Sequence, residues 1–256
     1  MDKTKIDWCD STWNPVTGCL HGCEYCYAWR IAKRFGKYHP DYSAYHNEHS
    51  MLHILDNPID GTPYPFEFDP TFHYYRLKEY QDKKRPRNIF VCSMSDLFGN
   101  WVPDDWIEEV FKACEKAPQH NYLFLTKNPK RYEKLLDKYM PPNMWFGWTQ
   151  TGPMGDKCDF ETHKSVKAFV SIEPLLKPFE KFRVRGVDWV IVGAETGNRK
   201  GRVIPERKWI EDIVNECRNE DIPVFMKSSL AEIWGEPLIQ EFPIQLMRKL
   251  AYKQLN

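Results

Sequence analysis

Three cysteines near the start of the chain, Cys19, Cys23 and Cys26, have the spacing of ligands to a metal centre. Three residues separate the first pair and two separate the second, so one short loop can present three thiolates to a compact inorganic group. Gly18 and Gly22 allow the sharp turns that such a loop requires. We expect the chain in the cytosol, where cysteines are thiols or metal ligands rather than disulfide partners.

The kind of centre depends on how many protein ligands are available. A structural zinc ion normally takes four, and Cys9 or His21 is a candidate for the fourth. A four-iron, four-sulfur cluster held by three cysteines instead leaves one iron open to a small molecule. The first alternative describes a zinc module without enzymatic activity that binds nucleic acid or a protein partner. The second describes an enzyme.

The pattern C-x-x-x-C-x-aromatic-C resembles the signature of the radical S-adenosylmethionine (SAM) superfamily. The resemblance implies that Cys19, Cys23 and Cys26 bind a [4Fe-4S] cluster and that Tyr25 lies near the adenine of SAM. It also implies the activity, in which an electron from the reduced cluster splits SAM and the resulting 5'-deoxyadenosyl radical removes hydrogen from a substrate. An external electron donor of the flavodoxin or ferredoxin type is then a partner.

Several further blocks are similar to a phage-associated "gene product" family of radical SAM-like proteins. These blocks are residues 13–19, 93–98, 125–127, 171–176 and 188–195. They are spread over most of the chain, from Ile6 to Lys227, and the resemblance implies a fold and a cofactor rather than a substrate. The glycine run ending in Glu that many radical SAM proteins place after the second strand is absent in that form. Its nearest counterpart, residues 193–195, follows a late strand.

The remainder of the chain alternates short apolar runs with amphipathic segments, which is the order of a parallel α/β fold. Besides a short strand before Cys19, strands are expected over residues 64–68, 88–93, 122–126, 145–149, 168–172, 188–192 and 223–226. Helices are expected over residues 27–37, 104–116, 129–139 and 205–219. This order predicts one domain over residues 1–256, a TIM-like (β/α) barrel that is complete or partly open.

Polar and charged residues follow many of these runs. Because barrel sites are built from the carboxyl ends of the strands, we expect these side chains to meet above the cysteine loop. The residues expected to hold SAM are Ser93, Ser95, Asp96, Lys127 and Glu173. Glu195 and Lys227 are the catalytic candidates, because a charge facing the barrel mouth is costly unless it is paired or used. An ion pair between these two that closes the barrel is the structural alternative.

Residues 38–71 interrupt the alternation and form an expected insertion that is rich in aromatic residues and histidines. His46, His49 and His53 would share one face of a helix there, as a second metal site or, in the interpretation that we prefer, as a polar surface over the barrel mouth. A second irregular stretch, residues 152–163, contains Cys158 and is expected to be a loop on the substrate side.

Charge and composition limit the partners. The chain has 36 Lys and Arg against 36 Asp and Glu, so a site for a polyanion has to be a local patch. The loop with Arg199, Lys200 and Arg202 is the best candidate for such a patch, with an ordinary solvated loop as the alternative. Aromatic residues make up 15% of the chain, which suits either the filling of the core or the stacking of flat rings. We therefore expect a nucleic acid or nucleotide as substrate. No run approaches the length of a membrane span, and we expect no membrane partner.

Overall fold

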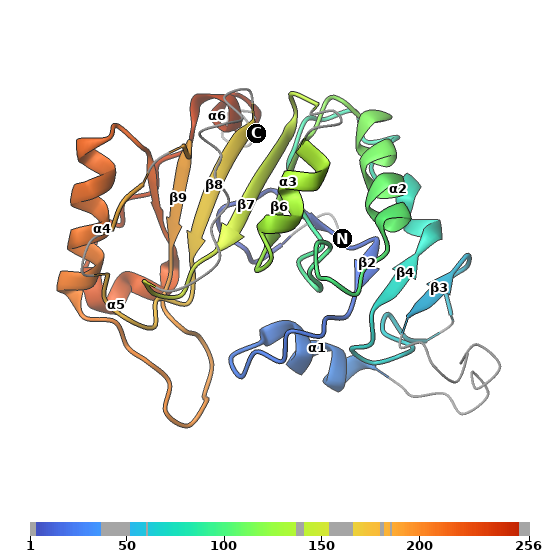
Figure 1. The fold of residues 1–256 in the computed structure, drawn as a ribbon, viewed down its shortest axis with the longest axis horizontal. Coiled ribbons are helices and arrows are strands. Elements are labelled where there is room, and N and C mark those ends of the chain that lie inside the picture. The colour runs from blue at the N-terminus through green and yellow to red at the C-terminus, as the bar shows by residue number, and fades with distance from the viewer. Residues whose placement is uncertain are drawn as a thin grey trace.

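The structure, a computed structural model, describes residues 4–36, 52–59, 61–136, 141–153, 166–179, 182–184 and 186–250. Within these ranges seven parallel strands form the main sheet in the order β1-β5-β6-β7-β8-β9-β10. Their bounds are β1 (Ser11–Trp13), β5 (Asn88–Val91), β6 (Asn121–Thr126), β7 (Met144–Thr149), β8 (Lys167–Ile172), β9 (Trp189–Val192) and β10 (Val224–Met226). The described parts of β1 and β10 do not pair, so the curved sheet in Figure 1 is a partly open barrel.

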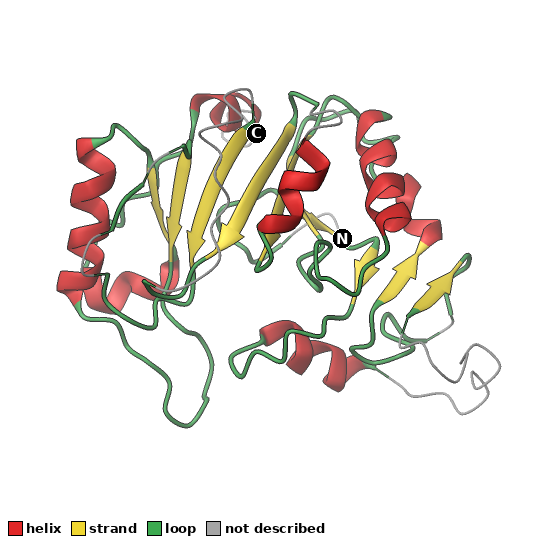
Figure 2. Cartoon of the chain, in the orientation of Figure 1, coloured by secondary structure: helices red, strands yellow, loops and turns green. Residues whose placement is uncertain are grey.

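Helices surround this sheet, some along its outer face and others across the ends of the strands, as Figure 2 shows. They are α1 (Tyr27–Phe35), α2 (Asp104–Glu115), α3 (Lys130–Leu136), α4 (Arg207–Asn219), α5 (Ala231–Trp234) and α6 (Ile244–Leu250), with 3-10 helices at Tyr74–Lys78 and Ser228–Leu230. The predicted α/β class and the predicted helices are confirmed to within a few residues at the described ends. None of the described helices is long and apolar enough to cross a membrane.

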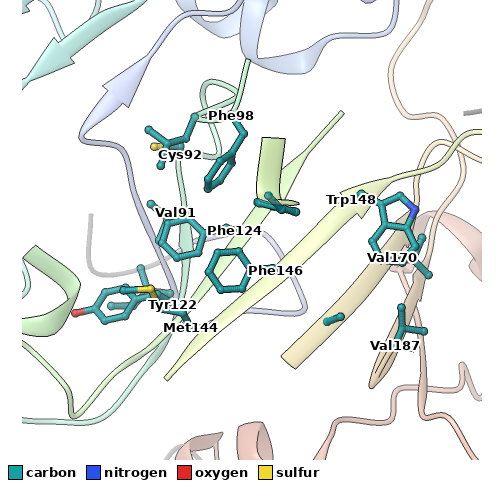
Figure 3. Packing of buried hydrophobic residues seen from close by; sticks show 14 of the residues in the cluster. Val91, Cys92, Phe98, Tyr122, Phe124, Met144, Phe146, Trp148, Val170 and Val187 are labelled. Carbon is teal, nitrogen blue, oxygen red and sulfur yellow. The ribbon is translucent and has the colours of Figure 1, made fainter. Parts of the chain in front are cut away.

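Strand residues alternate between two faces, and both faces of the sheet are apolar through most of its length. On the outer face, Phe124 of β6 and Phe146 of β7 stand in register with their rings stacked at 5.5 Å (Figure 3). The same cluster contains Val110 of α2 and Ile213 of α4, so it fastens the helices to the sheet. Two hydrophobic layers therefore hold each strand, and the strands provide a rigid support for whatever follows their carboxyl ends.

The inner face carries mainly large rings. Trp145, Phe169 and Trp189, from three neighbouring strands, are fully buried there, and Trp8 packs against this layer with its ring 4.7 Å from that of Phe90. A Cβ on Gly147 would lie 2.4 Å from the Phe169 ring, so only glycine leaves room for that ring. The amino-terminal half of the curved sheet is thus filled with side chains.

A second, smaller sheet forms from β2 (Val16–Thr17), β4 (Thr71–His73) and β3 (His53–Leu55). It attaches the end of the predicted insertion to the N-terminal region. The predicted strand at residues 64–68 is wrong, because this stretch is a series of turns with a single bridge at Tyr64. Pro65 has no N–H to donate to a ladder and Glu67 has a φ of 51°, so the run cannot pair as a strand.

The predicted helix with His46, His49 and His53 on one face is also wrong at His53. His53 lies in β3, where its ring stacks on Phe66 at 3.7 Å. His46, His49 and Cys158 lie outside the described residues. The described part of the insertion nevertheless reaches the site, because Tyr64 and Phe68 line the cavity described next.

Candidate functional site

A cavity of about 570 Å³ lies at the carboxyl ends of the strands. The segments directly after β5, β6, β8, β9 and β10 contribute to its wall, together with the cysteine loop, residues 18–26. Every residue expected from the sequence to bind metal, bind SAM or act in catalysis lines this cavity: Cys19, Cys23, Tyr25, Cys26, Ser93, Ser95, Asp96, Lys127, Glu173, Glu195 and Lys227. The fold brings these side chains together, while their individual roles remain predictions.

The cysteine loop is fastened at both ends. At its start, Gly18 has a φ of 84°, and a Cβ there would lie 2.2 Å from the carbonyl oxygen of Asp69, so only glycine fits. At its end, the Cys26 thiol caps α1 by accepting a hydrogen bond from the backbone N–H of Trp29 (3.3 Å). The first anchor depends on a distant segment and the second on the local sequence, and between them the loop faces the cavity.

Three thiols on one cavity wall are chemically suited to iron–sulfur binding. In the described part of the chain, however, no three His, Cys, Asp or Glu side chains lie close enough together to hold one metal ion. Burial raises the pKa of the Cys19 thiol to about 12, so a proton has to leave when a metal binds. Of the candidates for a fourth zinc ligand, Cys9 is buried in the inner aromatic layer and the His21 Nε2 atom is bound to Asp96 (2.7 Å).

The Asp96 carboxylate joins three segments of the cavity wall. Its Oδ1 accepts hydrogen bonds from the Thr126 hydroxyl (2.7 Å) and the Phe98 N–H (3.0 Å). Its Oδ2 accepts from His21 Nε2 (2.7 Å) and the Lys127 N–H (2.8 Å). Burial alone would raise the pKa of this carboxyl, but the hydrogen bonds outweigh burial and hold the pKa below its usual value. Asp96 is therefore engaged by the protein itself and positions the cysteine loop against β5 and β6.

Ser93 and Ser95 hold the segment that leads into the cysteine loop. The Ser93 hydroxyl donates to Asn14 Oδ1 (3.1 Å), and the Ser95 hydroxyl donates to the carbonyl oxygen of Val16 (2.9 Å). The Tyr27 hydroxyl in turn donates to the carbonyl oxygen of Ser93 (2.5 Å). Sequence reasoning did not assign Asn14 or Tyr27 to the site, although both lie within or beside the blocks that carry the family resemblance.

Two ion pairs lie in the wall after β8, β9 and β10, and neither is the Glu195–Lys227 pair that was the structural alternative from the sequence. Lys227 Nζ binds Glu173 Oε1 (2.5 Å), not Glu195. A Cβ on Gly193 would lie 3.0 Å from Lys227 and 3.2 Å from Glu173, so this pair passes directly over a glycine. Glu195 instead takes two hydrogen bonds from the Arg199 guanidinium (2.6 and 2.8 Å), which hold the pKa of its carboxyl below the usual value. The Glu195 side chain is 1% exposed.

Lys127 contributes a positive charge to the wall nearest the cysteines. Its ammonium lies 5.9 Å from the centre of the Tyr25 ring, and among the described residues no carboxylate is within ion-pair distance of it. Burial, followed by the nearby Cys23, raises the pKa of the Tyr25 hydroxyl. The ring and the ammonium together form a surface suited to a flat ligand that carries a negative group.

The N-terminal segment completes the cavity in a way that the sequence did not indicate. Residues 4–8 line it, and the Asp7 carboxylate accepts a hydrogen bond from the Ser228 N–H (2.9 Å) after β10. No motif or spacing marks Asp7, because its partner is more than two hundred positions away along the chain.

Comparison with known proteins gives one family. The model of the family described as "Protein of unknown function (DUF5131)" matches residues 3–244. No curated protein matches the chain. Among solved structures, a mutant spore photoproduct lyase with bound AdoMet and dinucleoside spore photoproduct is 12% identical with a TM-score of 0.44, and the match covers 98% of this chain but 64% of that one.

A second structure of spore photoproduct lyase, complexed with dinucleoside spore photoproduct, is 12% identical with a TM-score of 0.42. That match covers 79% of this chain and 59% of the other. The chain thus spans less than two thirds of the length of these two lyase chains.

Proposed function

The chain belongs to the family described as "Protein of unknown function (DUF5131)", and we propose that it is a radical SAM enzyme. One observation carries the proposal: the three cysteines of the C-x-x-x-C-x-x-C loop open into the same cavity as the polar ends of the parallel strands. Such an enzyme has to combine a metal-ligand motif with a ligand-sized cavity that is lined by convergent polar groups.

Cys19, Cys23 and Cys26 would hold the [4Fe-4S] cluster. When bound, the cluster supplies the electron that cleaves SAM reductively to methionine and a 5'-deoxyadenosyl radical, which abstracts hydrogen from substrate. Three thiols on one cavity wall suit a cluster, in which each thiolate binds its own iron and one iron is left open to a ligand. The reducing electron would come from a flavodoxin- or ferredoxin-like donor.

The side chains of the wall provide complementary groups for SAM. The Lys127 ammonium suits the SAM carboxylate, and the Tyr25 ring beside it suits the adenine. Glu173 suits the SAM ammonium, because Lys227 engages Oε1 and the described residues leave Oε2 without a partner. In this proposal Ser93, Ser95 and Asp96 act by holding the cysteine loop at a set distance from these groups.

Glu195 and Lys227, the catalytic candidates, each face the cavity as part of an ion pair. Glu195 is paired with Arg199 and Lys227 with Glu173, and each pairing offsets the cost of placing a charge in the cavity wall. Ile31, Tyr64 and Phe68 give part of the cavity an apolar lining. The role proposed for Glu195 and Lys227 is to orient the substrate against this apolar lining.

The proposal is tested by anaerobic reconstitution with iron and sulfide. Wild type should bind iron, turn brown and, with SAM and a reductant, release 5'-deoxyadenosine and methionine. Cys19→Ala, Cys23→Ala and Cys26→Ala should each lose most of the iron, because a three-thiolate site has no spare ligand. Cys114→Ala and Cys217→Ala are matched controls, since both thiols are fully buried in helices away from the cavity. Full iron content in all three loop variants, or a colourless zinc protein, would contradict the proposal.

A further inference from the structure

Helix α1 carries bulky rings on its solvent side. Its buried face consists of the small residues Ala28 and Ala32, whereas the Trp29 side chain is 49% exposed and that of Phe35 is 53% exposed. A nine-residue helix that buries its alanines and exposes its largest rings is the reverse of ordinary packing. Exposed apolar side chains that are grouped in this way mark an interaction surface.

Cations lie among these rings. Arg30 and Arg34 belong to α1, and Lys200 and Arg202 belong to the 196–204 loop. Neither α1 nor this loop contains an acidic residue. In the described part of the chain no carboxylate lies within ion-pair distance of any of these four cations, whereas Lys33 and Arg199 have carboxylate partners. A chain with no net charge therefore gathers unneutralised positive charge on this surface.

The helix and the loop meet although they are far apart in the sequence. Arg199 Nη1 lies 3.4 Å from Glu24 Oε2 in the cysteine loop, and a Cβ added at Gly197 would lie 3.0 Å from Arg30 Nη1. Figure 1 shows α1 and the loop after β9 on the same side of the molecule, below the carboxyl ends of the strands. We name the surface formed by Trp29, Arg30, Arg34, Phe35, Lys200 and Arg202 the aromatic–basic rim.

The aromatic–basic rim borders the mouth of the cavity. Ile31, from the same helix, lines the cavity, as does Thr196 at the start of the loop, whereas Trp29, Phe35, Lys200 and Arg202 do not. A chain-like ligand that lay along the rim would therefore extend past the site, with one of its units placed to enter it.

We propose that the aromatic–basic rim binds single-stranded nucleic acid and that one nucleotide unit of that strand is the substrate of the cavity. Exposed rings and cations on one surface match an unpaired strand, because its bases offer free faces for stacking while its phosphates meet the cations. A duplex keeps its bases stacked inside and leaves exposed rings without a partner. An acidic protein would satisfy the cations but not the rings. The substrate part of this proposal rests on the proposed radical SAM function, whereas the binding part does not.

Binding is measured by the fluorescence anisotropy of labelled single-stranded DNA and RNA of about fifteen nucleotides, with the full chain and no SAM. Trp29→Ala and Phe35→Ala should each weaken binding by roughly five- to a hundredfold, the range of one lost base–ring stack. The Lys200→Gln/Arg202→Gln double variant should flatten the salt dependence, lowering the slope of log K against log salt by about 0.7 for each cation removed.

Matched controls lie elsewhere on the molecule. Met247→Ala removes an equally exposed apolar side chain on α6, and Lys208→Gln removes an exposed cation on α4. Both should bind as wild type does, and thermal unfolding shows whether each rim variant is folded. Equal affinity for duplex, equal competition by polyglutamate, no binding by wild type, or equal losses in rim and control variants would overturn the inference.

The two proposals fail separately. A chain that binds the oligonucleotide but neither iron nor SAM refutes the radical SAM function and leaves the rim as a nucleic-acid surface. A chain that cleaves SAM but does not bind the oligonucleotide refutes the inference alone. Reconstituted wild type that cleaves SAM in the presence of a bound strand with deuterated nucleotides should also transfer deuterium into 5'-deoxyadenosine. SAM cleavage without such transfer would overturn the substrate assignment.

Discussion

The inner face of the sheet has two halves of opposite character. Near the amino ends of the strands, Trp145, Phe169 and Trp189 fill the space with rings. Near the carboxyl ends, the same strands lead into the cavity with Ser171 and Glu173 on its wall. On β8 the change takes two residues, from Phe169 to Ser171. This arrangement separates tasks: the packed half stabilises the fold, and the open half keeps polar groups available to a ligand.

The largest expected loss of stability comes from a truncated side chain in the packed half. Phe169→Ala should lower the free energy of unfolding by about 3–5 kcal/mol, because it removes a fully buried ring from a layer that cannot collapse around the void. Ser171→Ala, two residues along the same strand, should change it by less than about 1 kcal/mol, since its hydroxyl faces the cavity. Urea unfolding of both variants measures the contrast, and similar losses would remove the proposed division between the halves.

Asp96 lies in the open half, yet its hydrogen bonds stabilise the fold, so it tests how strictly the two halves differ. Asp96→Asn should cost about 1.5–3 kcal/mol, since an amide nitrogen cannot accept the hydrogen bonds that reach one oxygen from His21 and Lys127. Thr126→Val, which removes a single neutral donor, should cost about 0.5–1.5 kcal/mol. Unchanged stability of Asp96→Asn together with lost SAM binding would instead identify Asp96 as a direct SAM ligand.

The smallest effect concerns Arg199 and depends on pH. Arg199→Gln should lower the free energy of unfolding near neutral pH, because it removes the two hydrogen bonds to the buried Glu195 carboxylate. The Glu195 pKa is lower in the folded chain than its usual value of 4.5, so the pair stabilises the fold above pH 4.5. This contribution is lost as the pH falls through the folded pKa, and the difference between wild type and variant should shrink there.

A matched exposed pair gives the control for that measurement. Lys208→Gln breaks a solvated pair with Asp212 on α4 and should change stability by less than about 0.5 kcal/mol at any pH. Unfolding followed from pH 3 to pH 8 tests both variants. A loss for Arg199→Gln that grows toward acid would contradict the assigned direction of the Glu195 pKa.

Much of the fold was predictable because the signals are local. Helix α4 was expected over residues 205–219 and spans Arg207–Asn219, since apolar spacing along a helix is set by neighbouring residues. The convergence of the candidate site residues was also predictable, because the carboxyl ends of parallel strands share one edge. The stretch 64–68 misled because its aromatic residues alternate like those of a strand, while Pro65 prevents the pairing.

The amino-acid sequence by itself determined part of the cavity lining, because the spacing of the cysteines and the position of each polar residue after its strand can be read along the chain. Only the tertiary structure decided which partner each of them has. Glu195 pairs with Arg199, Lys227 pairs with Glu173, and Asp96 takes His21 from a loop some seventy residues away. The periodicity of the sequence predicts on which face of a helix or strand a residue lies. The distance between two charged side chains depends instead on the register and curvature of strands that are distant in sequence, and these follow from the packing of the whole sheet.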